Sequence, residues 1–230
     1  MADPRNKVNE IWSRLVSILD RKQLVILGPA GAGKTCLHAY LRDHQIPDPE
    51  YIATLHAKNV RRSLIRVQDA GGTIEFRRLK KGKDVPGNMK AASDTWKASL
   101  ADADIVIFLF NASRLRSGDE AYGAEISDQC KTIALWLAEQ ERKSAADLPG
   151  LVVAGTHCDL DDDYRDATSG GSDHQRYEAT VVLNPYLAAG LNSLGRVIDP
   201  RPKLFVGSLA SNAAADELIA RMFQDGTFAK

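Results

Sequence analysis

Short runs of consecutive apolar residues recur along the chain and predict strands that are buried on both faces. They cover residues 23–28, 105–110, 151–155 and 203–207. A strand without polar alternation is typical of a parallel sheet that helices cover on both sides. Segments with apolar residues at helical spacing lie between and after these runs, most clearly over 117–142 and 212–223. This alternation of strand and helix predicts an α/β fold with a doubly wound, mostly parallel sheet.

Two half-polar segments, 64–67 and 73–76, interrupt the alternation. The residues that join them, QDAGG, contain a glycine pair that suits a tight turn, so the two segments predict an antiparallel hairpin. We expect this hairpin at the edge of the main sheet. The sheet would then have six strands, mostly parallel with one antiparallel edge strand.

The length suits one α/β domain, and we expect residues 22–230 to form it. Residues 4–20 place their apolar side chains on one stripe, which predicts an extra helix in the N-terminal segment 1–21. Asp, Gly, Ser and Pro are frequent at both ends of the segment 160–202. That composition predicts a long, partly ordered insertion, which contains a helix near 174–190.

Composition and charge exclude several classes of protein. Hydrophobic residues make up 44% and charged residues 26%, which argues against disorder. The 30 basic and 30 acidic residues give a net charge of zero, so no overall positive field favours nucleic acid. The three cysteines, Cys36, Cys130 and Cys158, are scattered and form no C-x-x-C pair, which argues against a disulfide framework and a thiolate zinc site.

Targeting signals are not evident. The N-terminal residues are too polar for a secretory signal, the apolar runs are far shorter than a membrane span, and the chain ends without a prenylation box. We therefore expect a cytoplasmic protein without a membrane anchor. The sequence does not indicate an oligomeric state.

The most specific motif is GPAGAGKT at residues 28–35, which matches G-x-x-x-x-G-K-[ST] between a predicted strand and a predicted helix. The glycines let successive backbone N–H groups point inward and form a nest for a diphosphate. Lys34 is expected to reach the β- and γ-phosphates, and the Thr35 hydroxyl to bind Mg²⁺. The predicted phosphate-side contacts are Gly28, Pro29, Ala30, Gly31, Ala32, Gly33, Lys34, Thr35 and Cys36.

A second motif, THCD at 156–159, directly follows the strand predicted at 151–155. With the phosphate loop, it resembles the Ras-like, TRAFAC-class P-loop small GTPases, in which an [NT]-K-x-D motif holds guanine. Thr156 and Asp159 match that motif, and His157 replaces the lysine that stacks on the base. A carboxylate at 159 accepts from both the ring N–H and the exocyclic amine of guanine, a donor pair that adenine lacks. Capping of the following helix or loop is the other reading of Asp159.

The resemblance implies further site residues. Ser208 and Leu209, in GSLA after the last predicted strand, match the loop that touches guanine O6. Thr54 matches the threonine that closes over the γ-phosphate and Mg²⁺ from the first switch loop. These assignments extend the expected nucleotide site to both ends of a GTP molecule.

The family also needs a D-x-x-G motif whose aspartate organises Mg²⁺, and two candidates are present. Asp69 follows the more strand-like segment, but Asp84 is 21 residues before Ile105, about what one switch loop and one short helix require. We favour Asp84 with Gly87, while Asp69 stays the alternative. Asn88 then takes the place of the glutamine that orients water. Its side chain is one methylene shorter, so we expect slow hydrolysis.

Several charged and apolar residues near these motifs can be interpreted as functional groups or as ordinary surface and core residues. A basic cluster is either a solvated surface or a site for an acidic partner; it comprises Arg77, Arg78, Lys80, Lys81, Lys83 and Lys90. Arg114 and Arg116 are either surface charges or a source of an arginine for the phosphates. Trp96 and Leu100 share one face of a helix predicted over 89–101 and are expected to pack it on the sheet.

The resemblance implies a divergent small GTPase, which we expect to be bacterial, acting as a Mg²⁺-dependent GTP/GDP switch with slow intrinsic hydrolysis. Lys34, Gly87 and Asn88 would serve catalysis, and Thr35, Thr54 and Asp84 the metal. An effector or regulator protein would bind the switch loops. Two alternatives stay open: a GTP-binding scaffold with little or no hydrolysis, and a P-loop small-molecule kinase.

Overall fold

A computed structural model gives the fold of most of the chain. It describes residues 22–43, 45–47, 58–60, 64–68, 74–78, 82–84, 89–141, 148–169 and 174–224. The helix predicted over 4–20 lies outside these residues. In the part of the chain that is described, no helix is both long and apolar enough to span a membrane.

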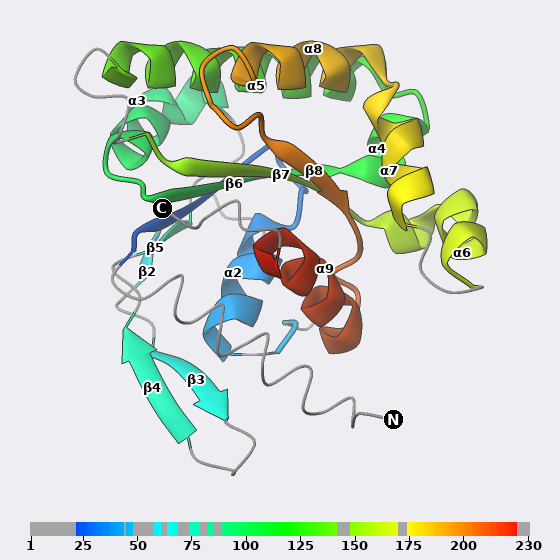
Figure 1. Ribbon diagram of the computed structural model, residues 1–230, viewed down its shortest axis with the longest axis horizontal. Coiled ribbons are helices and arrows are strands. Elements are labelled where there is room, and N and C mark those ends of the chain that lie inside the picture. The colour runs from blue at the N-terminus through cyan, green and yellow to red at the C-terminus, as the bar shows by residue number, and fades with distance from the viewer. Residues whose placement is uncertain are drawn as a thin grey trace.

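A twisted, mostly parallel sheet forms the centre of the molecule (Figure 1). Its strands are, in spatial order, β2 (Lys58–Val60), β5 (Gly82–Asp84), β1 (Leu24–Leu27), β6 (Ile105–Asn111), β7 (Gly150–Thr156) and β8 (Lys203–Val206). β1 pairs in parallel with both β5 and β6, and β7 pairs in parallel with β6 and β8. The predicted α/β class with a parallel sheet is confirmed.

The expected edge of this sheet was wrong. The segments around 64–67 and 73–76 do form an antiparallel hairpin, β3 (Leu64–Gln68) with β4 (Ile74–Arg78), but it is a separate two-stranded sheet (Figure 1). The antiparallel edge strand of the main sheet is instead β2, which pairs with β5. Both of these strands have only three residues and carry polar side chains, so no hydrophobic pattern marks them in the sequence.

Helices cover both faces of the sheet (Figure 1). α2 (Lys34–Asp43) and α9 (Asn212–Gln224) lie on one face, and α3 (Met89–Ala101), α5 (Glu120–Glu141) and α8 (Pro185–Leu194) lie on the other. Successive side chains of β1 serve the two layers in turn. Ile26 packs with Leu37 of α2, whereas Val25 belongs to the cluster that contains Trp96 of α3. The predicted packing of α3 through Trp96 is thus confirmed.

The described part of the segment 160–202 (160–169 and 174–202) contains three α-helices rather than the single one predicted near 174–190. They are α6 (Asp162–Ser169), α7 (His174–Val182) and α8. The break comes at Asn184, whose side chain accepts hydrogen bonds from the backbone N–H groups of Tyr186 and Leu187, and at Pro185 in the first turn of α8. α8 packs closely on α5: a Cβ placed on Gly190 would lie 3.0 Å from Cβ of Cys130.

The helix predicted over 117–142 corresponds to α5 (Glu120–Glu141), and a further short helix that was not predicted precedes it. A short helix, α4 (Ala112–Arg116), follows β6 directly, and α5 begins only at Glu120. The Asn111 side chain caps α4 by accepting from the backbone N–H of Arg114. Gly118, with φ of +83°, forms the turn between the two helices.

Candidate nucleotide-binding site

The loop between β1 and α2 has a backbone that only glycine accommodates at its start. Gly28 has φ of +138°, and a Cβ there would lie 1.9 Å from the carbonyl oxygen of Leu109 in β6. Gly31 and Gly33 have φ of +74° and +83°. The predicted phosphate loop therefore lies tightly against the carboxyl end of the central strands. In an open α/β sheet, ligands bind at this edge between two neighbouring strands whose outgoing connections run in opposite directions. β1 and β6 are such a pair, because the chain continues from β1 toward β5 and from β6 toward β7.

Lys34 opens α2 and is buried, with its ammonium group folded over the loop. Nζ donates to the carbonyl oxygens of Gly28, at 2.9 Å, and Pro29, at 2.7 Å. A cation and the N-terminal end of a ten-residue helix thus meet at one loop. Both favour an anion, so the geometry suits a phosphate group.

The predicted base-side residues lie against the phosphate loop. A Cβ placed on Gly33 would lie 3.1 Å from Cδ1 of Leu209, 3.7 Å from Oγ1 of Thr156 and 3.8 Å from Cε1 of His157. Cys36 contacts the same side, with Sγ 3.8 Å from the carbonyl oxygen of Leu209. Three separate sequence motifs therefore converge at one edge of the sheet.

Thr156 connects the end of β7 to the phosphate loop through its hydroxyl group. Its buried hydroxyl lies 3.0 Å from the carbonyl oxygen of Ala32 and 3.1 Å from that of Phe110. Nδ1 of His157 is 2.8 Å from the same hydroxyl oxygen. Since the hydroxyl proton serves the carbonyls, Nδ1–H of His157 is best assigned as donor to Thr156, which leaves Nε2 unprotonated in the neutral ring.

His157 has a left-handed backbone, with φ of +59° and ψ of +25°, directly before the 3₁₀ helix η2 (Cys158–Leu160). Burial lowers the pKa of its imidazole, and the negative charge of Asp159 opposes that shift only in part. A neutral ring is therefore favoured near neutral pH. An uncharged ring beside Gly33 presents a flat surface at the position where the family resemblance implies stacking on a base.

Asp159 and Ser208 form a short hydrogen bond between the loops after β7 and β8. The buried Ser208 hydroxyl donates to Oδ1 of Asp159 and accepts from the backbone N–H of Ala210 at 2.9 Å. The backbone N–H of Cys158 also donates to the carbonyl of Gly207 at 3.2 Å. The carboxylate is thus oriented while retaining lone pairs for another donor.

The candidate metal residues are only partly described. Asp84 is the last residue of β5, opposite Ile26 of the parallel strand β1. The carboxyl ends of parallel strands meet at one edge, so residue 84 is at the edge that carries the phosphate loop. Thr35, in the first turn of α2, follows that loop. A hydroxyl and a carboxylate are ligand types that suit Mg²⁺.

The other switch residues lie outside the described residues. These are Thr54, Asp69, Gly87 and Asn88. Their assignments stay predictions. The register of β5 with β1 nevertheless gives Asp84 a position that its sequence spacing only suggested.

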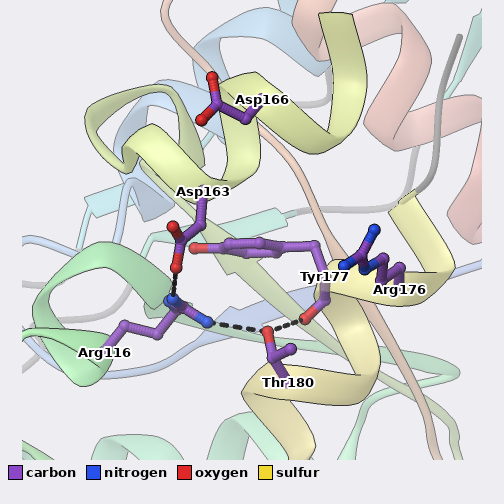
Figure 2. Close-up of a pocket in the computed structure, with 6 residues that line it drawn as sticks. All are labelled: Arg116, Asp163, Asp166, Arg176, Tyr177 and Thr180. Carbon is purple, nitrogen blue, oxygen red and sulfur yellow. Dashed lines mark hydrogen bonds and ion pairs between the residues drawn. The ribbon is translucent and has the colours of Figure 1, made fainter. Parts of the chain in front are cut away.

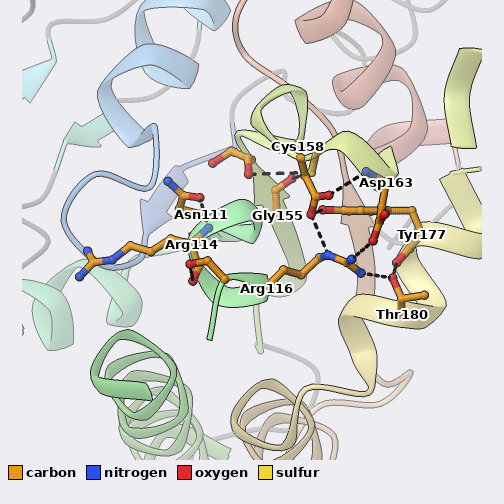
Figure 3. A network of polar contacts seen from close by, with 11 residues as sticks. Asn111, Arg114, Arg116, Gly155, Cys158, Asp163, Tyr177 and Thr180 are labelled. Atoms are coloured by element: carbon orange, nitrogen blue, oxygen red, sulfur yellow. Dashed lines mark hydrogen bonds and ion pairs between the residues drawn. The ribbon is translucent and has the colours of Figure 1, made fainter. Parts of the chain in front are cut away.

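Polar contacts around the loop after β7 join Arg116 to residues that the sequence analysis did not single out (Figure 3). Arg116 contacts Asp163 and, with Nε 2.7 Å from Oδ2, Asp161. Tyr177 of α7 donates to the same Asp161 oxygen at 2.6 Å. The run of three aspartates after the THCD motif is the one sequence signal that could have indicated this cluster.

The two arginines after β6 are each engaged with carboxylates. Nε of Arg114 lies 2.6 Å from Oδ2 of Asp119, and its guanidinium covers the ring of Tyr122 with 4.4 Å to the ring centroid. Arg116 pairs with Asp161 and Asp163, as described. In this arrangement both side chains hold local structure, which favours the reading of ordinary ion pairs over a phosphate-directed arginine.

No protein-family model matches this sequence, and no curated protein matches it at a significant level. A fold of this kind hosts many functions, so the functional argument depends on the residues of the site.

Proposed function

We propose that this chain binds guanine nucleotides with Mg²⁺ and hydrolyses GTP slowly, as a small GTPase switch of the Ras-like type. The observation that carries the proposal is the convergence at Gly33. The backbone of the phosphate loop there lies against Thr156, His157 and Leu209, from the two loops in which the resemblance implies base recognition. Neither loop is near residue 33 in sequence, so their meeting is a property of the fold.

The division of labour follows from the chemistry of the residues. The glycine-rich backbone and Lys34 would bind the phosphates, and the Asp159 carboxylate would accept from guanine. Thr35 and Asp84 would hold Mg²⁺, which when bound offsets the charge of the phosphates. Asn88 would orient water less well than a glutamine, so hydrolysis would be slow without a partner protein.

Calorimetry with GDP and ADP, with magnesium present, tests the binding part of the proposal. We expect tight binding of GDP and weak binding of ADP. Asp159→Asn should reduce the preference for guanine by roughly 100-fold, because a carboxamide cannot accept from both donors of the base. Lys34→Ala, the matched control for the phosphate side, should weaken both nucleotides. Equal affinity of the wild type for GDP and ADP would contradict the proposal.

Phosphate release under single-turnover conditions separates the switch from the scaffold alternative. Slow release with GTP and none with ATP supports a GTPase. The replacement of glutamine by Asn88 favours the scaffold, in which bound GTP would persist for hours. The kinase alternative predicts transfer to an acceptor and an unchanged base preference after Asp159→Asn.

A further inference from the structure

Asp161 lies between η2 and α6. Its backbone N–H donates to the carbonyl of Cys158 at 3.0 Å and so closes η2, the short helix that carries Asp159. Its carboxylate accepts from the backbone N–H of Asp163 at 3.0 Å, which caps the start of α6. The conformation of residue 161 therefore determines both where η2 ends and how α6 departs.

Two side chains from outside this segment hold the Asp161 carboxylate. Tyr177 donates through its hydroxyl at 2.6 Å, and Arg116 lies with Nε at 2.7 Å, both to Oδ2. The guanidinium of Arg116 covers the Tyr177 ring at 5.0 Å from its centroid and donates to the Thr180 hydroxyl at 2.8 Å. Figures 2 and 3 show the neighbouring side chains Arg116 of α4, Asp163 of α6, and Tyr177 and Thr180 of α7 pointing toward one another.

The Asp161 carboxylate is shielded from water. Its side chain is only 12% exposed and that of Arg116 is 24% exposed, although a pocket of about 380 Å³ opens beside Arg116, Tyr177 and Thr180 (Figure 2). Burial, followed by the hydrogen bond to Asp161, raises the pKa of Tyr177 well above its ordinary value. Its hydroxyl therefore stays protonated and acts as a donor. Water cannot readily replace either partner of a shielded carboxylate.

We propose that Arg116 and Tyr177 are positioning residues for base specificity: through Asp161 they fix η2 and thereby orient the carboxylate of Asp159. This inference rests on the proposed binding of guanine by Asp159. It gives α7, part of the segment 160–202, a role in nucleotide selection that acts through Asp161. Neither residue touches the phosphate loop in any contact described for it, so affinity for phosphate groups should not depend on them.

The test compares GDP, ADP and inorganic triphosphate as ligands of the full chain by calorimetry. Tyr177→Phe removes only the donor to Asp161. We expect the preference for GDP over ADP to fall by about tenfold, the loss typical of a hydrogen bond to a charged group. The affinity for inorganic triphosphate should be unchanged. A merely structural role of Tyr177 would weaken all three ligands together.

Tyr186→Phe is the matched control. Tyr186 lies on α8 against Gly123 of α5, and its loss of a hydroxyl should leave the GDP to ADP ratio as in the wild type. Arg116→Lys serves as the second variant if Tyr177→Phe does not fold. It keeps the charge but lacks the fork that spans Asp161, Asp163 and Thr180, so the ratio should fall again.

Each outcome decides the matter. A folded Tyr177→Phe or Arg116→Lys variant with the wild-type ratio overturns the positioning role and leaves the proposed function intact. A wild-type protein that binds GDP and ADP equally overturns the proposed function first, and the positioning role with it. A reduced ratio with unchanged triphosphate affinity supports both.

Discussion

The hydroxyl of Thr156 lies 3.0 Å from the carbonyl oxygen of Ala32, a residue 124 positions earlier in the chain. This hydrogen bond joins the end of β7 to the phosphate loop. The same hydroxyl is 3.1 Å from the carbonyl oxygen of Phe110 at the end of β6. One side chain thus sets the relative positions of three segments at the edge of the sheet where the nucleotide is expected.

Replacing Thr156 with valine should destabilise the protein and weaken nucleotide binding. The substitution preserves shape but removes the one hydroxyl proton that the carbonyls of Ala32 and Phe110 share, which costs about 1–3 kcal/mol. Urea unfolding followed by circular dichroism measures the loss. Thr156→Ser keeps the hydroxyl and should retain most of the stability. Equal stability of the valine and serine variants would mean that the hydroxyl does not join these loops.

Gly28 and Gly31 offer a matched pair of alanine substitutions in one loop. At Gly28 a Cβ would lie 1.9 Å from the carbonyl oxygen of Leu109, so Gly28→Ala should cost about 3 kcal/mol or more. At Gly31 no atom lies within 4 Å of such a Cβ, so only the positive φ is unfavourable, at about 1–2 kcal/mol. Thermal unfolding of both variants measures the difference. Similar losses would show that the packing against β6 is not the cause.

Substitutions of Asp84 and Asp69 should affect the magnesium dependence of GTP binding differently. Asp84 is at the carboxyl end of β5, beside β1, so Asp84→Asn should weaken the stimulation of GTP binding by Mg²⁺ about 10- to 100-fold. Asp69→Asn is the control and should leave the magnesium titration unchanged. The reverse result would transfer the metal-side role to Asp69.

Stability should fall on acidification because of His157. Burial lowers the pKa of its imidazole in the folded state below the ordinary 6.5, so the unfolded chain binds the proton more readily. The folded protein therefore loses stability as the pH falls below 6.5, and the loss ends once the pH is below the folded-state pKa. His157→Asn does not titrate and tolerates a positive φ. Its unfolding midpoint should depend less on pH than that of the wild type in this window.

The sequence was most informative where apolar side chains are frequent. The central strands were predicted from continuous apolar runs, and the helix predicted over 89–101 coincides with α3 (Met89–Ala101) because Trp96 and Leu100 share one buried face. β2 and β5 were not predicted. Three-residue strands such as Gly82–Asp84 owe their conformation to pairing with neighbours, which local pattern does not contain.

The site residues also divide into those that a local motif predicts and those that depend on contacts between distant segments. Lys34, Thr156 and Asp159 were predicted as site residues because each belongs to a motif whose spacing has a chemical reason. Asp161 and Tyr177 were not, because their importance comes from a contact between α7 and η2 that no motif encodes. The helix break at Asn184 could have been predicted, since an asparagine followed by proline is a strong start signal for a helix.

The close packing of α8 on α5 at Gly190 has a practical consequence for anyone shortening this protein. The composition of residues 160–202 suggests an insertion that could be removed. However, Leu187 and Leu194 are fully buried in the same cluster as Val153 of β7. Excising the segment would expose the apolar side chains that Leu187 and Leu194 now cover. The trimmed product should precipitate rather than yield a minimal domain.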